Sequence, residues 1–224
     1  MTETAAGRRA AAPGLDGTGW LADDLYLMAH DDRTGRLLLS ARAAGLGLAG
    51  ALLADLVLAG CVRVAGGQVA VTGAAAPGDG LAAGVLGVLA SEQPPRPVAD
   101  WLAFLARTAP AEVAGRLERA GYLVPVVARP WRTARWRPAD PDCAFAPIVR
   151  VQAALSPGRP ADTQGVALAG LAGACGLGAR LALYLAPGAR ARIEAATAQL
   201  GPGLRELIAG TQAAVGAALL AHRI

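Results

Sequence analysis

The sequence predicts a mainly α-helical protein, a single compact helical-bundle domain with small β-hairpins. Hydrophobic residues make up 54% of the chain but aromatic residues only 4%, so the core must consist chiefly of Ala, Leu and Val. Such small side chains favour closely packed helices over sheets built from bulky residues. Apolar residues recur at helical spacing along most of the chain, and strand-like alternation is confined to short stretches.

The expected elements follow one another without a change in composition that would mark a second domain. Residues 1–17 are expected to form a flexible tail and residues 18–224 the domain. Helices are expected at 20–29, 43–59, 81–90, 98–107, 111–120, 147–155, 164–185, 191–200 and 204–221. Strands are expected at 36–40, at 62–64 paired with 68–72, and at 123–127 paired with a return strand near Trp136.

Gly45, Gly47 and Gly50 have the spacing of a dinucleotide-binding fingerprint. However, the expected strand ends well before Gly45, and no Asp or Glu occurs between Asp55 and Asp79, where a ribose-binding acid would stand. We therefore expect a buried helix whose glycines let neighbouring backbones approach, and no cofactor. The uncharged segment 165–179 is too short and too rich in Ala and Gly to cross a bilayer, so it is expected to be a central buried helix.

The cysteines and the N-terminus indicate a cytoplasmic setting. Cys61, Cys143 and Cys175 are odd in number, far apart and never in a CxxC pair, which argues against a disulfide framework and against a zinc site. Residues 1–17 contain no apolar run of signal-peptide length. The net charge of +4 comes from Arg alone, because the chain has no Lys. Arg suits phosphate groups, but this mild basicity does not distinguish lipid from nucleic acid.

Residues that could carry catalysis or bind a metal are sparse. His30 and His222 have no neighbouring base or ligand at helical spacing, and both are expected to lie on the surface. Asp23, Asp24, Asp31 and Asp32 form the main acidic group, but they do not match a calcium loop. We expect a helix with an acidic solvent face that runs into an Asp-rich turn, no metal site and no enzyme.

A basic segment with two tryptophans is the strongest candidate for a binding surface. If the chain reverses near 133–134, its tryptophans become cross-strand neighbours with arginines beside them. This arrangement would suit anionic lipid headgroups, with Trp131 and Trp136 in contact with the membrane. Equally, the tryptophans could fill the core, or the arginines could meet DNA phosphates. The candidate headgroup-binding residues are Arg107, Arg129, Arg132, Arg135 and Arg137.

A winged-helix nucleic-acid-binding regulator is the alternative function. A helix followed by a basic-edged hairpin occurs twice, at 51–72 and 111–137. However, the helix at 51–59, which would enter the DNA groove, is almost wholly apolar and lacks side chains that read base edges.

Three stretches, in order, resemble the Golgi phosphoprotein 3 family of peripheral membrane proteins. They are residues 21–64, with the Asp-Arg-x-Gly turn at 32–35; Gln93-Pro94-Pro95, with Trp101 behind it; and residues 117–123. The resemblance implies a mostly helical, non-catalytic protein that binds phosphatidylinositol 4-phosphate and links membrane-protein tails to coat proteins. It also implies self-association through a hairpin at 124–138. The high Ala, Gly and Arg content indicates a bacterial homologue.

The family's headgroup pocket uses one tryptophan and three arginines. The resemblance places the tryptophan at Ser40, the first arginine at Ala49, and the other two near Arg107 and Pro110. At most one of the pocket residues is therefore retained. We expect a peripherally associated, non-enzymatic membrane or adaptor protein in which the specific headgroup pocket is largely absent.

Overall fold

The computed structural model describes residues 18–92, 94–126, 135–156, 162–185 and 187–221. Its helices are α1 (Leu21–Ala29), α2 (Ala41–Leu58), α3 (Gly80–Ser91), α4 (Val98–Leu105), α5 (Ala109–Arg119), α6 (Pro141–Ala154), α7 (Thr163–Ala174), α8 (Gly178–Tyr184), α9 (Ala189–Thr197) and α10 (Pro202–Ala221). Its strands are β1 (Val62–Ala65), β2 (Gln68–Val71), β3 (Arg96–Pro97), β4 (Leu123–Val126) and β5 (Arg135–Pro138). The predicted mainly α-helical domain with small hairpins is thus confirmed.

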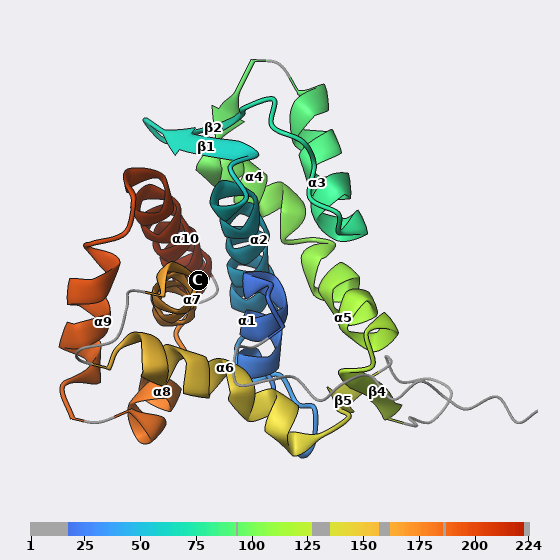
Figure 1. Cartoon of the computed structure of the whole chain (residues 1–224), viewed down its shortest axis with the longest axis vertical. Helices are drawn as coiled ribbons and strands as arrows, with labels where there is room; N and C mark the ends of the chain where they lie inside the picture. The colour runs from blue at the N-terminus through green and yellow to red at the C-terminus, as the bar shows by residue number, and fades with distance from the viewer. Residues whose placement is uncertain (1–17, 93, 127–134, 157–161, 186, 222–224) are drawn as a thin grey trace, which may run out of the picture.

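Two central helices organise the bundle (Figure 1). α2 packs against α1, α4, α5, α7 and α10, while α1 also contacts α5, α6 and α7. The antiparallel sheet β1-β2-β3 lies at one end of the molecule (Figure 1). α6, α8 and the antiparallel hairpin β4-β5 lie at the other end (Figure 1). The two ends therefore present different surfaces.

The glycines of α2 allow close packing, as the sequence predicted. A Cβ at Gly45 would lie 2.6 Å from the Ala106 carbonyl oxygen, and one at Gly50 would lie 2.5 Å from Oγ1 of Thr211. At Gly47 it would lie 2.2 Å from Sγ of Cys175. A larger side chain at any of these positions would push a neighbouring helix away.

Two of the described helices are long and apolar enough to cross a membrane. Of α2, 78% is buried inside the domain, as expected for a core helix. Burial of α2 also removes the winged-helix interpretation of this region, because residues 51–56 cannot lie in a DNA groove. Of α10, 28% is buried, through one face that includes Leu207 and Thr211. α10 therefore packs along the bundle on one side only.

Three expected elements differ from the structure for local reasons. Segment 36–40 forms no strand, only an isolated bridge between His30 and Leu37. The helix expected at 164–185 is two helices, α7 and α8, because Gly176 adopts a φ of +96° that cannot continue a helix. The helix expected to begin at residue 147 begins at Pro141, where the side chain of Asp140 accepts a hydrogen bond from the Asp142 backbone N–H.

Candidate functional site

The positions that the resemblance assigns to the family's headgroup pocket are occupied by residues with structural roles. Ser40 caps α2, its hydroxyl accepting a hydrogen bond from the Ala43 backbone N–H at 3.2 Å. Ala49 is fully buried in the middle of α2. Pro110 is half-buried in the first turn of α5. Backbone N–H groups in the first turn of a helix have no partner within the helix, so a proline there costs no hydrogen bond. None of the three offers a charged or aromatic group to a headgroup.

Arg107 is exposed just after α4, and its guanidinium lies 5.1 Å from the centre of the Phe104 ring. It is separated from strand β5 by α5, whose 11 residues span about 16 Å at about 1.5 Å per residue. Arg107 and Arg137 therefore lie at opposite ends of α5. They do not converge on a single pocket.

The hairpin register confirms the expected pairing of 123–127 with a strand at Trp136, but the residue opposite Trp136 is Pro125 rather than a tryptophan. Pro125 of β4 stands opposite Trp136 of β5, and Val124 stands opposite Arg137. Trp136 is half-buried against the core, whereas Arg137 is exposed. Arg135 occupies the first position of β5. Arg129, Trp131 and Arg132 lie outside the described residues.

The Asp-Arg-x-Gly turn packs directly onto this hairpin. Gly35 has a φ of +63°, and a Cβ there would lie 1.9 Å from the Trp136 carbonyl oxygen. The Asp31 carboxylate holds the turn by accepting hydrogen bonds from the Thr34 backbone N–H at 2.8 Å and hydroxyl at 2.6 Å. Both arginines of this segment, at positions 33 and 36, are exposed. The turn thus adds two exposed arginines beside Arg137.

Helices α6 and α8 extend the same end of the molecule. Phe145, in the second turn of α6, meets Tyr184 of α8 edge to face, with ring centres 5.7 Å apart. The Arg180 guanidinium lies 5.9 Å from the Tyr184 ring centre. The hydrogen bonds from Thr34, with a smaller contribution from the charge of Arg180, lower the pKa of Asp31. α8 itself packs against α6 and α7.

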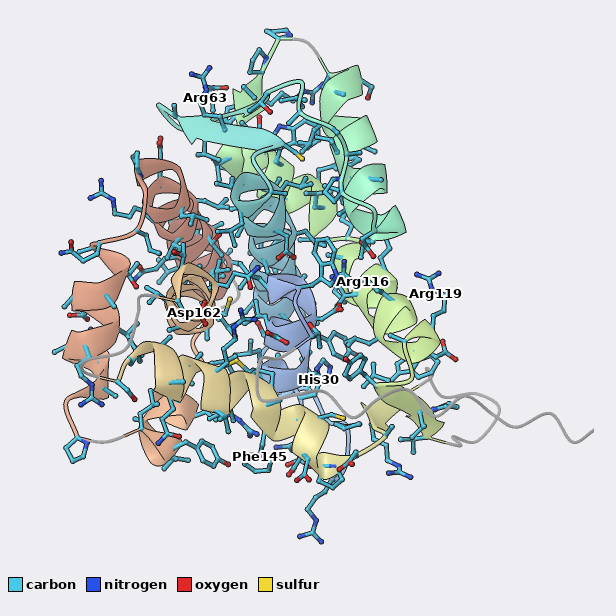
Figure 2. All side chains as sticks on the ribbon, viewed as in Figure 1. His30, Arg63, Arg116, Arg119, Phe145 and Asp162 are labelled. Carbon is cyan, nitrogen blue, oxygen red and sulfur yellow. The ribbon has the colours of Figure 1, made fainter. Side chains whose placement is uncertain are left out.

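These elements form one surface, which we name the basic-aromatic end. Figure 2 shows Phe145 at this end and Arg63 at the opposite one. Its acids include Asp31 and Asp140, whose carboxylates accept backbone hydrogen bonds from Thr34 and Asp142. Asp32 and Asp142 are its remaining acids. The described residues that define this end are Arg33, Arg36, Trp136, Arg137, Phe145, Arg180, Leu183 and Tyr184.

Sequence reasoning missed Arg33, Arg36, Arg180 and the apolar side chains of α8. A usable signal for the first two was present, because a tight turn before a helix exposes its intervening side chains. Arg180 and Leu183 were assigned to the last turns of a single helix at 164–185, of which residues 165–179 were expected to be buried. Only the break at Gly176 brings them to the surface.

The first acidic pair is buried rather than solvent-facing, which corrects a second prediction. Asp23 accepts a hydrogen bond from Nε of Arg116 at 2.9 Å, and Nη1 of Arg116 donates to Asp79 at 2.8 Å. The Arg116 guanidinium also lies 5.1 Å from the Trp20 ring centre. α1 is surrounded by other helices, so its acids are tolerated only because an arginine reaches them.

The other acids around α1 are held in the same way. Nη1 of Arg150 lies 3.4 Å from Asp24, and its Nε lies 3.1 Å from Asp162. Asp55 accepts from the backbone N–H groups of the first residues of α1, Leu21 at 2.8 Å and Ala22 at 3.2 Å. Burial raises the pKa of Asp55 to about 7, although these two hydrogen bonds act to lower it. The network fixes α1 and stands apart from the basic-aromatic end.

His30 is half-buried, not on the open surface as expected. Its Nδ1–H donates to the Tyr26 carbonyl at 2.7 Å, and the two rings stack with centres 4.1 Å apart. Burial lowers the pKa of His30. The imidazole therefore has a structural role at the end of α1.

The described residues hold no group of three His, Cys, Asp or Glu side chains arranged to bind a metal ion. Cys61, Cys143 and Cys175 are all free and buried. The comparison with curated proteins finds no match. The sequence model of the family Golgi phosphoprotein 3 (GPP34) matches residues 21–218, which is most of the chain. This protein therefore belongs to the Golgi phosphoprotein 3 family.

Proposed function

We propose that this chain is a non-enzymatic peripheral membrane protein that binds anionic lipid surfaces from the cytoplasmic side through the basic-aromatic end. The observation that carries the proposal is the gathering of exposed arginines and partly exposed aromatic residues on one end of the bundle. The opposite end carries the sheet β1-β2-β3 instead (Figure 1).

Charge and side-chain chemistry support this choice of surface. Each Arg near an anionic membrane contributes about 1 kcal/mol, and aromatic rings with a polar tip favour the interfacial zone. Two of the four acids at this end are engaged with backbone N–H groups. The four arginines that define this end equal its four acids in number. In the sequence, residues 127–134 add Arg129 and Arg132 and no acid, so by sequence these segments contain more arginine than acid.

The proposed recognition is of charge density rather than of one headgroup. A specific headgroup pocket needs several arginines converging on the same phosphate. In this chain Ala49 is buried and Ser40 caps a helix. Arg107 and β5 lie at opposite ends of helix α5. A diffuse arginine surface attracts any anionic lipid, and salt screens that attraction.

The proposal includes an adaptor role, with membrane-protein tails as clients and self-association through residues 124–138. Among the described strands β4 and β5 pair only with each other, and the outer edge of β5 faces the turn at Gly35, so the open edge is that of β4. An unpaired edge can accept a further strand from a second copy or from an extended tail.

Vesicle co-sedimentation tests the lipid part of the proposal. Purified protein is expected to sediment with vesicles that contain phosphatidylserine and to be released by about 0.5 M salt, because the Debye length falls to a few ångström. Phosphatidylinositol 4-phosphate at equal surface charge should improve binding less than tenfold, which corresponds to about 1.4 kcal/mol.

Equal binding to neutral and anionic vesicles would contradict the proposal. A preference of tenfold or more for the phosphoinositide would show that other residues rebuild a specific pocket. Selection of one sequence motif from random duplex DNA would favour the nucleic-acid-binding alternative, because salt-dependent duplex binding alone can arise from arginine charge.

A further inference from the structure

We propose that α8 is a membrane-inserting element, and that Leu183 and Tyr184 enter the interfacial zone of an anionic bilayer when the domain binds. This inference rests on the proposed function and adds to it. Charge attraction would bring the domain to the surface, and α8 would supply the apolar contact that holds it there.

The apolar tip of α8 is exposed. Leu183 is 81% exposed, more than any other large hydrophobic side chain among the described residues, and Tyr184 is 40% exposed. The neighbouring small residues Ala179 and Ala182 are exposed as well. A Leu side chain left in water forgoes the free energy of burial that a bilayer could supply.

The exposure is imposed by packing on both sides of the tip. Leu181 is 1% exposed and Leu185 is 8% exposed, so the residues before and after the tip are anchored in the core. The Tyr184 ring is held edge to face against Phe145. α8 also contacts α6, α7 and α9. Leu183 is thus held outward on a supported helix.

The charge around the tip matches an anionic bilayer. Between Asp162 and Glu194 the sequence contains three arginines and no acid. Among the described residues no carboxylate lies within ion-pairing distance of Arg180, whose guanidinium lies near the Tyr184 ring. Arg190 pairs with Glu194 at 2.9 Å, and Arg192 donates to the Pro187 carbonyl. An apolar tip flanked by arginine is suited to the boundary between acyl chains and phosphate groups.

A bilayer fits this surface better than a second protein does. A stable protein interface buries about 800 Å² on each side around a packed apolar centre. At α8 the exposed large apolar side chains are Leu183 and Tyr184. Two such side chains beside arginines are enough for shallow membrane insertion, where the remaining contact is electrostatic.

An environment-sensitive dye at position 183 tests the inference. The native cysteines are 1%, 5% and 2% exposed at positions 61, 143 and 175, so the variant Leu183→Cys can be labelled selectively. Its emission is expected to shift to the blue and rise severalfold on addition of phosphatidylserine vesicles, but not of neutral vesicles. The matched control is Leu220→Cys on α10, where the native side chain is 68% exposed. The dye at position 220 should not respond.

Co-sedimentation of the same samples separates the inference from the proposed function. Vesicle-bound protein with an unchanged dye at position 183 would overturn the α8 inference alone, whereas protein that fails to bind vesicles would overturn both. Leu183→Asp is expected to weaken binding about tenfold or more, and Leu220→Asp to leave it unchanged. A blue shift that appears without vesicles and grows with protein concentration would assign the tip to contact between two copies and contradict bilayer insertion.

Discussion

Replacing Arg116 by methionine is expected to lower the free energy of unfolding by about 3 to 5 kcal/mol, because it leaves buried carboxylates without their partner. The Arg116 side chain is 8% exposed and bridges Asp23 of α1 to Asp79, the residue that caps α3. Methionine keeps most of the apolar volume of the arginine stem, so the loss reports mainly the charge. Chemical denaturation followed by circular dichroism measures it.

The effect of this replacement should depend on pH. Burial raises the pKa of Asp23 from 3.8 to about 7, although the Arg116 charge opposes the rise. A raised carboxyl pKa means that the folded state binds a proton that the unfolded state releases, so its contribution to stability falls as pH rises from about 4 to about 7. Without Arg116 the pKa of Asp23 should rise further. The destabilisation should therefore be larger at pH 8 than at pH 5.

Arg119→Met on the same helix is the matched control, because Arg119 is exposed (Figure 2). It is expected to change stability by less than about 0.5 kcal/mol. A similar loss in both variants, or a loss at Arg116 that does not vary with pH, would argue against a buried ionic network around α1.

Replacing Gly35 by alanine is expected to lower the free energy of unfolding by about 3 kcal/mol or more. A φ of +63° costs a residue with a Cβ roughly 1 to 2 kcal/mol. The added Cβ would also lie 1.9 Å from the Trp136 carbonyl oxygen, so the turn and β5 must separate. Thermal unfolding of the variant measures the loss.

Gly66→Ala isolates the contribution of backbone conformation. Gly66 has a φ of +58°, and no atom lies within 4 Å of the position that its Cβ would take. Its replacement is expected to cost only about 1 to 2 kcal/mol. Equal losses at the two glycines would mean that the Asp31 turn does not support the hairpin.

Much of the fold could be predicted from the sequence because helix periodicity and turn glycines are local signals. The β1-β2 hairpin across Gly66-Gly67 and the glycine contacts of α2 were confirmed. The break between α7 and α8 was missed because the apolar pattern continues through Cys175 and Leu177, and only the backbone at Gly176 interrupts it.

The candidate site was less accessible from the sequence because it depends on contacts between distant segments. Asp23 looked like a surface residue, since its partner Arg116 lies far along the chain, on the apolar face of α5. Likewise, local alternation did not fix which residue stands opposite Trp136. The basic-aromatic end exists only because the fold brings the Asp31 turn, β5, α6 and α8 together.

Charge reversal at the two ends of the molecule tests the central claim most directly. The double variant Arg33→Glu with Arg137→Glu lowers the net charge of the basic-aromatic end by four units. Each charge near the membrane contributes about 1 kcal/mol to the attraction. The control, Arg63→Glu with Arg205→Glu, makes the same change in net charge at two exposed arginines outside that end. Affinity for phosphatidylserine vesicles is expected to fall at least tenfold in the first variant and less than about twofold in the second. Equal losses, or a larger loss in the control, would contradict binding through the basic-aromatic end.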